Sequence, residues 1–378
     1  MRFQLLLTLC LLLTSSTVAH CDDAMLFISS FAAGDEGAIH TCRFDLKSGK
    51  LTLLRKATDI ENPFFLAVSA NGRFLYAVDA EKFGDEINEF VAAYQVESGT
   101  GKLTRLNQQS AMGRTSCYLD TDDSGKTVVV ANYSSGDIAA LPVKKDGTLG
   151  EATSFIRHSG SSVDPARQKA PFAHCIEISP DNRFALAADL GADKVFVYSL
   201  DAETAKLTAN PAQPSVSITP GSGPRHLTFH PNGKRVYVIN ELKNTVTFFD
   251  YEPKAGTLKE RQTISTLPDE FSGTSYCADL KITPDGRFLY GTNRGHDSLA
   301  CYRIADDGRL SVIAIEPSLG KGPQNLLITA DGRWLLCANM PGNNVAVFAI
   351  NDDSGELKPN GEPVEIKMPS CIRWLPTR

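Results

Sequence analysis

The sequence lacks an excess of basic residues and, beyond its N-terminal region, any long apolar run. Lys and Arg total 38 against 44 Asp and Glu, which gives the 378-residue chain a formal net charge of −6. Because a protein that follows a phosphate backbone normally needs a basic patch, this balance argues against a nucleic-acid partner. No later segment is apolar enough to cross a bilayer, so we expect no membrane span.

The sequence also lacks the cysteine spacings of zinc sites, CxxC and CxxH. Six of its nine Cys residues stand within apolar, strand-like runs: Cys117, Cys175, Cys277, Cys301, Cys337 and Cys371. A free Cys in such a run behaves as a small buried hydrophobe. Core packing is therefore favoured over a disulfide framework.

The first 19 residues have the pattern of a secretory signal peptide. Arg2 precedes an apolar run, and small and polar residues follow up to Ala19. The run is too short for a membrane anchor. A lipoprotein signal is disfavoured because His20 precedes Cys21 where a small residue is normal. The sequence predicts a protein exported to the periplasm or the medium after cleavage near Ala19.

Two signatures recur about every 50 residues. The first is a turn followed by a β-rich run, found in SANGRFLYAVD, DDSGKTVVVAN, SPDNRFALAAD, HPNGKRVYVIN, TPDGRFLYGTN and TADGRWLLCAN. The second is a Gly/Ala-x-Leu turn, with its Leu at positions 51, 103, 149, 207, 258, 310 and 357. No segment of helical period interrupts them. Four-strand units repeated at this period predict an all-β fold, a β-propeller.

The ends of the chain set the predicted number of blades. Residues 25–55 supply three strands of one unit, and residues 369–376 supply a lone first strand. Six internal blades and one blade shared by both termini make seven. We therefore predict that residues 20–378 form a single seven-bladed β-propeller domain, with four antiparallel strands per blade.

Alignment of the repeats distinguishes structural positions from candidate functional positions. An Asp or Asn recurs at one position in all six internal blades, which favours a structural role at the strand end: Asp79, Asn132, Asp189, Asn240, Asn293 and Asn339. Functional residues should instead break the repeat. Four ionisable residues do so at one rim of the channel: His174, Arg225, Glu241 and Arg294. A hairpin register without gaps places Arg225 directly opposite Glu241.

Each of these four residues also has a purely structural interpretation. His174 would then be a half-buried histidine, Arg225 and Glu241 an ion pair that closes the channel, and Arg294 a solvated side chain. Their common location favours a binding site, because propellers bind ligands where the blades converge.

Four further residues are candidate substrate contacts at the same rim: His226, Asp279, Gln324 and Tyr133. His226 either lines the mouth or bonds between blades, and the sequence leaves both open. A metal site would require His174, His226 and Asp279 to converge. We expect no metal.

Three stretches resemble the seven-bladed propeller lactonase family, which includes bacterial 6-phosphogluconolactonases and fungal carboxy-muconate cyclising enzymes: PFAHCIEISPDNRFALAADLGADKV, GPRHLTFHPNGKRVYVINEL and TPDGRFLYGTNRGHDSLACYRI. The resemblance extends from about residue 25 to the end. It implies that His174, Arg225, Glu241 and Arg294 belong to the active site. Gln324 departs from the family, whose members usually have Arg at this position, so one anion contact is expected to be missing.

Opening a lactone requires an activated water, stabilisation of the oxyanion and a group that holds the ring in place. His174 or Glu241 is the candidate base, and we favour His174, with Glu241 orienting Arg225. Arg225 and Arg294 suit an oxyanion or a carboxylate. A covalent serine mechanism is disfavoured, because no GxSxG motif occurs between a strand and a helix. No cofactor is expected.

Three functions remain open at this stage. The first is an exported lactonase that hydrolyses a small sugar-acid or carboxylated lactone. Because 6-phosphogluconolactone arises in the cytoplasm, export argues for another substrate. The second is a muconate-type lactonising cycloisomerase, which would use the same groups. The third is a non-catalytic propeller that binds a ligand or a protein. The expected partner is a small molecule, and no pattern indicates an oligomeric state.

Overall fold

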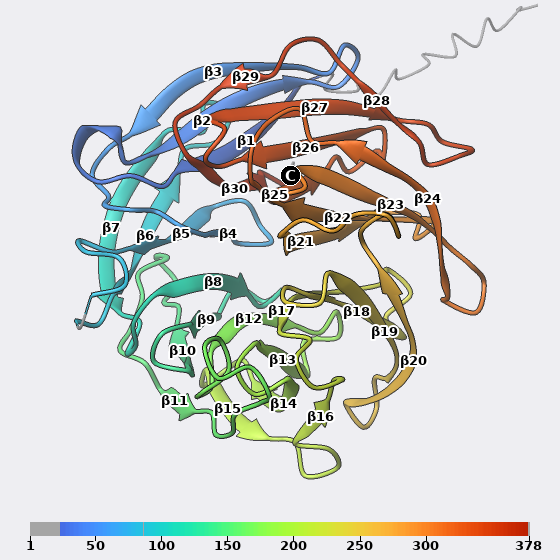
Figure 1. Cartoon of the computed structure of the whole chain (residues 1–378). Helices are drawn as coiled ribbons and strands as arrows, with labels where there is room; N and C mark the ends of the chain where they lie inside the picture. The colour runs from blue at the N-terminus through green and yellow to red at the C-terminus, as the bar shows by residue number, and fades with distance from the viewer. Residues whose placement is uncertain (1–22, 86, 377–378) are drawn as a thin grey trace, which may run out of the picture.

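A computed structural model describes residues 23–85 and 87–376. The predicted signal peptide lies outside the described residues. Seven antiparallel sheets form a ring around a central channel (Figure 1), which confirms the all-β, seven-bladed propeller. Within the described ranges the only helical segment is a single 3-10 turn, η1 (Gly34–Glu36). In this part of the chain no helix is long and apolar enough to cross a membrane.

In each internal blade the strands follow one another in chain order from the channel outward. Those of the first three internal blades are β4 (Leu66–Val68), β5 (Phe74–Asp79), β6 (Phe90–Val96) and β7 (Leu103–Ser110); β8 (Ser116–Thr121), β9 (Thr127–Asn132), β10 (Asp137–Pro142) and β11 (Ser154–Arg157); and β12 (Ala173–Ile178), β13 (Phe184–Asp189), β14 (Lys194–Asp201), β15 (Lys206–Ala209) and β16 (Ser215–Ser217). In the third of these blades the outer position is divided, because β15 and β16 both pair with β14.

The next three blades repeat this order. Their strands are β17 (Pro224–Phe229), β18 (Arg235–Asn240), β19 (Thr245–Glu252) and β20 (Thr257–Ser265); β21 (Tyr276–Ile282), β22 (Phe288–Arg294), β23 (Ser298–Ile304) and β24 (Leu310–Pro317); and β25 (Pro323–Ile328), β26 (Trp334–Asn339), β27 (Asn344–Ile350), β28 (Leu357–Pro359) and β29 (Val364–Glu365). The innermost strands of all blades line the channel (Figure 1).

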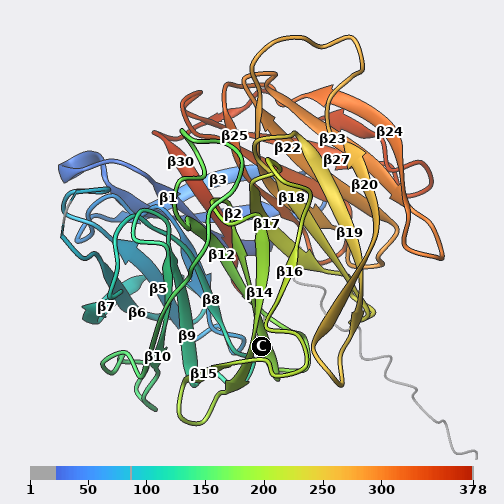
Figure 2. The same cartoon turned by 60° about the horizontal axis from the view of Figure 1, so that its bottom comes forward.

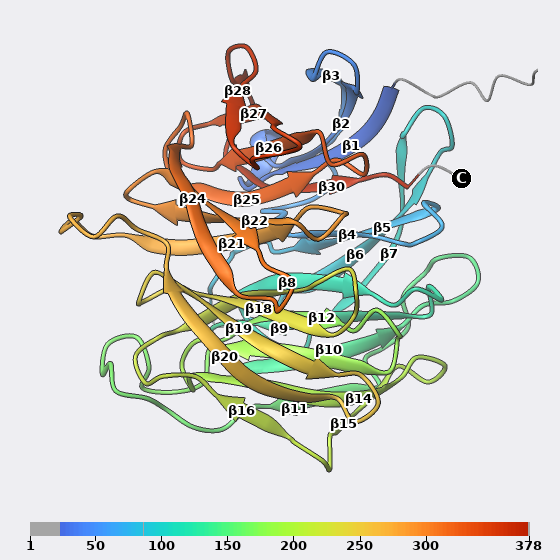
Figure 3. The ribbon, with the colours of Figure 1, turned by 90° about the vertical axis from the view of Figure 1, so that its right-hand side faces the viewer.

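Both ends of the chain form the seventh blade, as predicted. It contains β1 (Asp23–Ser30), β2 (Ala38–Asp45), β3 (Lys50–Ala57) and, on the channel side, β30 (Pro369–Trp374). Strands β1 and β30 are antiparallel, with Leu26 opposite Trp374 and Ile28 opposite Ile372 (Figure 3). Pairing the first and last strands closes the ring and gives this blade its innermost strand.

The recurring turn and Gly-x-Leu signatures have distinct structural causes. The turn residue has a positive φ in every internal blade, which favours Gly or Asn: Gly72, Gly125, Asn182, Gly233, Gly286 and Gly332. The second signature lies at a seam between blades. A Cβ on Gly355 would lie 2.3 Å from Phe288 Cδ1 of the preceding blade. Tyr290 Oη donates a hydrogen bond of 2.8 Å to Gly355 O at the same seam.

The structural roles predicted for the Asp/Asn position and for Cys are also confirmed. Asp189 Oδ1, for example, accepts hydrogen bonds from the backbone N–H groups of Phe172 and Ala192. Asn293 Nδ2 donates to Thr266 O. Every Cys in the described ranges is buried and free of disulfides.

The predicted gap-free hairpin register is wrong. Pro224 pairs with Asn240 and His226 with Ile239, so that Arg225 is an extra residue on its strand and does not lie directly opposite Glu241. The same irregularity occurs at Cys117, His174 and Gln324. A β-bulge turns the extra side chain away from the regular pleat. At the start of these inner strands, bulges therefore aim side chains at the channel mouth.

Candidate active site

Glu241 is the centre of an ionic cluster at the channel mouth. It follows β18, and its backbone N–H donates to Gly223 O. Arg225 Nε lies 3.0 Å from Glu241 Oε2, and Arg294 Nη2 lies 2.8 Å from the same oxygen. Despite the corrected register, the predicted contact between Arg225 and Glu241 is therefore present, and Arg294 joins it.

A third guanidinium completes the cluster. Arg167 Nη2 donates a hydrogen bond of 2.5 Å to Glu241 Oε1. Burial alone would raise the pKa of Glu241, but Arg294, Arg225 and Arg167 outweigh burial and hold this pKa below its ordinary value. Glu241 is therefore ionised at neutral pH. Three guanidiniums around one carboxylate leave an excess of positive charge at the mouth.

The three guanidiniums differ in exposure. Arg225 is 1% exposed and also donates through Nη1 to Ala278 O at 2.6 Å. The side chains of Arg167 and Arg294 are 33% and 27% exposed. Arg225 is thus held inside the structure, whereas Arg167 and Arg294 present N–H groups to solvent at the mouth.

His174 lies beside this cluster, buried, on β12. Its Nδ1 is 3.6 Å from Cys117 Sγ, and its ring is 5.3 Å from that of Tyr133 and 5.4 Å from that of His226. Burial and the nearby positive charge of Arg225 lower the pKa of His174 well below its ordinary value. The imidazole is therefore neutral at pH 7, the form that accepts a proton.

His226 and Asp279 form a bond between blades. Arg225 Nη1 lies 3.1 Å from His226 Nε2, and His226 Nδ1 lies 2.9 Å from Asp279 Oδ1. Because a guanidinium only donates, Nε2 is the acceptor and Nδ1–H donates to Asp279. Burial lowers the pKa of His226 to about 3, so that this ring is neutral. Of the two alternatives left open by the sequence, the structure shows the bond between blades.

Asp279 is fully buried and has further partners. Its Oδ1 accepts from Lys281 Nζ at 3.0 Å, and its Oδ2 accepts from Asn325 Nδ2 at 2.7 Å. Burial opposes ionisation, yet Lys281 and His226 keep the pKa of Asp279 far below its ordinary value. His226 and Asp279 thus brace Arg225 from inside the channel. Their role as substrate contacts stays a prediction.

Tyr133 and Gln324 occupy different surroundings. The Tyr133 ring stacks on Phe172 at 4.9 Å and borders His174, so it lies with the cluster. Gln324 on β25 is buried, and its Oε1 has no hydrogen-bond partner among the described residues. Over the same ranges, no group of three or more His, Cys, Asp or Glu side chains is arranged to hold a metal ion.

Comparison with known proteins identifies the family. Residues 25–374 match the model of the family described as Lactonase, 7-bladed beta-propeller. The chain belongs to the seven-bladed β-propeller lactonase family.

Several members of the lactonase family with a named activity are similar to this chain. It is 32% identical over 351 residues to 6-phosphogluconolactonase of Bacillus subtilis, covering 92% of this chain and 97% of that protein. It is also 32% identical to 6-phosphogluconolactonase of Formosa agariphila, over 79% of this chain and 85% of that protein. The structure of the periplasmic gluconolactonase of Pseudomonas aeruginosa superposes with a TM-score of 0.86 and 32% identity, covering 93% and 99% of the two chains. These relatives support a lactone-hydrolysing enzyme.

Arg167 is the site residue of this propeller lactonase that sequence reasoning missed. It belongs to the connection between β11 and β12, which is a green loop in Figure 2. Asp164 Oδ1 accepts from Arg167 N, and Gln168 Nε2 donates to Leu190 O, so the loop is held in shape. The sequence offered one signal for this loop, its length. The connection 158–172 is longer than the equivalent connections 111–115 and 318–322.

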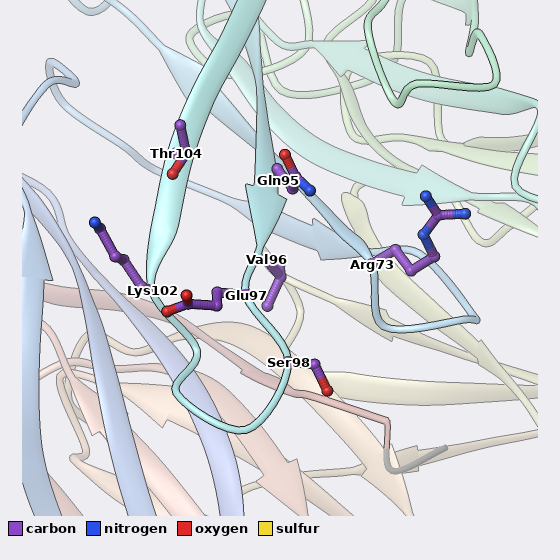
Figure 4. Close-up of a pocket in the computed structure, with 7 residues that line it drawn as sticks. All are labelled: Arg73, Gln95, Val96, Glu97, Ser98, Lys102 and Thr104. Carbon is purple, nitrogen blue, oxygen red and sulfur yellow. The ribbon is translucent and has the colours of Figure 1, made fainter.

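Another hollow of the lactonase propeller lies away from this cluster. It has a volume of about 590 Å³ and lies in the first internal blade, beside Arg73 and the loop that joins β6 to β7 (Figure 4). Arg73, Glu97 and Lys102 are among the residues that line it. None of the predicted site residues contributes to it.

Proposed function

We propose that this protein hydrolyses a small lactone that carries a carboxylate or is derived from a sugar acid. The observation that carries the proposal is the Glu241 carboxylate held by Arg167, Arg225 and Arg294 beside a neutral His174. The excess positive charge suits an anionic substrate, because guanidinium groups bind carboxylates through paired N–H bonds.

His174 is the general base of the proposed reaction. Its Nδ1 faces Cys117, which leaves Nε2 to take a proton from a water at the mouth. The water oxygen then bonds to the lactone carbonyl carbon, and the carbonyl oxygen becomes an oxyanion. Arg294, which is partly exposed, stabilises this charge, and Arg167 holds the anionic group of the substrate. When the ring C–O bond breaks, the His174 imidazolium returns the proton to the leaving oxygen, and a hydroxy acid is formed.

Glu241 and Arg225 position the reacting groups. Glu241 is ionised by its three cationic neighbours, so it is a weak base and serves to orient their guanidiniums. Arg225 is fixed by Glu241, Ala278 O and His226. Its charge lowers the pKa of His174, and an anionic substrate would offset this effect and make the bound His174 a better base.

The proposal is tested by proton release in a weakly buffered indicator assay. Gluconolactone, its 6-phosphate and a muconolactone are each compared with their spontaneous hydrolysis. We expect release above background with one of them, lost in His174→Ala and retained in His40→Ala, which alters a histidine on β2 of another blade. If none of the three lactones releases protons, hydrolysis is contradicted. Cyclisation of a muconate would then show a cycloisomerase, and a ligand-induced shift of the melting temperature alone would show a binding propeller.

The proposal includes export. The pattern of residues 1–19 supports it, as does the similarity to the periplasmic gluconolactonase of Pseudomonas aeruginosa. An exported enzyme would meet an unphosphorylated lactone. Mass spectrometry of the chain recovered from periplasm or medium should give a protein that starts at His20. A chain found only in the cytoplasm with Met1 intact would contradict export.

A further inference from the structure

The channel has a second polar end, opposite the Glu241 cluster. The inner strands begin at that cluster and finish at a cavity of about 420 Å³. It is lined by charged side chains from four different inner strands, Asp120 of β8, Glu177 of β12, Lys281 of β21 and Arg373 of β30, and by Asp123 of the turn after β8. The volume is in the range of small-ligand sites.

The guanidinium of Arg373 has N–H groups that are available to a ligand in this cavity. Its Nη1 donates to Ile372 O at 2.9 Å, and its guanidinium lies 4.4 Å from the centre of the Phe65 ring. Among the described residues it has no carboxylate partner. Lys281 differs, because its Nζ already lies 3.0 Å from Asp279 Oδ1. The remaining N–H groups of Arg373 therefore suit a carboxylate ligand.

Asp120 and Glu177 suit hydroxyl groups. Asp120 Oδ2 accepts from Ile178 N at 2.8 Å, and Glu177 Oε2 accepts from Tyr118 Oη at 3.2 Å. Burial raises the pKa of Asp120 to about 6 and that of Glu177 to about 8. A carboxylate accepts hydrogen bonds from ligand hydroxyls, and a protonated carboxyl also donates one.

We propose that this cavity binds a small polyhydroxylated carboxylate, with the carboxylate on Arg373 and the hydroxyls on Asp120 and Glu177. The site would be separate from the proposed lactonase site and does not depend on that function. A neutral polyol would lack the partner for Arg373, and a simple carboxylate would lack the partners for Asp120 and Glu177. Both should bind more weakly than a ligand that combines the two groups.

Isothermal titration of gluconate, glucitol and acetate at pH 7 tests the proposal. We expect gluconate to bind at least tenfold more tightly than the other two. Arg373→Gln should weaken gluconate binding at least tenfold, whereas Arg294→Gln, which alters the opposite end, should leave a binding event of wild-type affinity. No heat with any ligand, or binding lost in Arg294→Gln and kept in Arg373→Gln, would overturn the proposal. Because no lactone is turned over, the outcome is independent of catalysis.

Because Arg373 lies on the strand that closes the ring, its substitution can impair folding. A second measurement therefore uses the unaltered protein. Phenylglyoxal modifies accessible arginines, and peptide mass spectrometry reports the rate at each position. Gluconate should slow modification of Arg373 at least tenfold, whereas glucitol should not. Equal rates at Arg373 with and without gluconate would refute the site.

Discussion

Arg167 Nη2 lies 2.5 Å from Glu241 Oε1 and joins the connection between β11 and β12 to the residue that follows β18. Because Arg167 is one-third exposed, it can contact a ligand and Glu241 at the same time. Arg225 on the opposite oxygen is buried. This difference in exposure gives Arg167 a binding role and Arg225 a positioning role.

Arg167→Met tests the binding role. The substitution keeps apolar contact with the Tyr276 ring, over which the guanidinium lies at 5.5 Å, but removes the charge. We expect KM to rise about tenfold, the equivalent of one charged hydrogen bond, with a much smaller change in kcat. Steady-state kinetics on the lactone identified by proton release provides the measurement. An unchanged KM would remove Arg167 from the site.

Glu241→Gln tests the positioning role. The amide matches the shape of the carboxylate but leaves the buried Arg225 charge uncompensated. We expect the free energy of unfolding to fall by about 3 kcal/mol and kcat/KM to fall about 100-fold. Urea unfolding and kinetics measure the two effects. Glu81→Gln, at an exposed position, is the matched control and should change neither. Full activity in Glu241→Gln would contradict the proposed arrangement.

The pH profile tests His174. A general base must be deprotonated, and burial together with Arg225 lowers the pKa of His174 well below 6.5. As the pH falls from 8, kcat/KM should therefore stay constant through 6.5 and decline only at lower pH. The profile is measured in buffers of constant ionic strength, with spontaneous hydrolysis subtracted. A half-maximal value near 6.5 would show a base with an ordinary histidine pKa.

Gly355→Ala tests the seam between blades. Gly355 has a φ of 77°, and an added Cβ would lie 2.3 Å from Phe288 Cδ1. We expect a loss of about 1–3 kcal/mol from overpacking, in addition to backbone strain. Gly361→Ala is the control, because Gly361 has a φ of 71° and no heavy atom within 4 Å of the added Cβ. Equal thermal stabilities of the two variants would show that the seam contact contributes nothing.

Repeat comparison predicted part of the site and missed the rest for identifiable reasons. His174, Arg225, Glu241 and Arg294 break a pattern that the other blades keep, so aligned positions reveal them. Arg167 lies in a connection that is longer than its counterparts in other blades, so no aligned position corresponds to it. The length marks the connection as unusual, but only the hydrogen bond to Glu241 shows that Arg167 belongs to the site.

The sequence by itself determined the number of blades, the closure by both termini and the rim where charged residues gather, because these follow from a period and from strand alternation. Tertiary structure decided which atoms meet. Bulges at Arg225 and His174 changed the register, since one extra residue re-aims a side chain without altering the hydrophobic pattern. The bond between His226 and Asp279 likewise depends on how neighbouring blades pack, which no single repeat encodes.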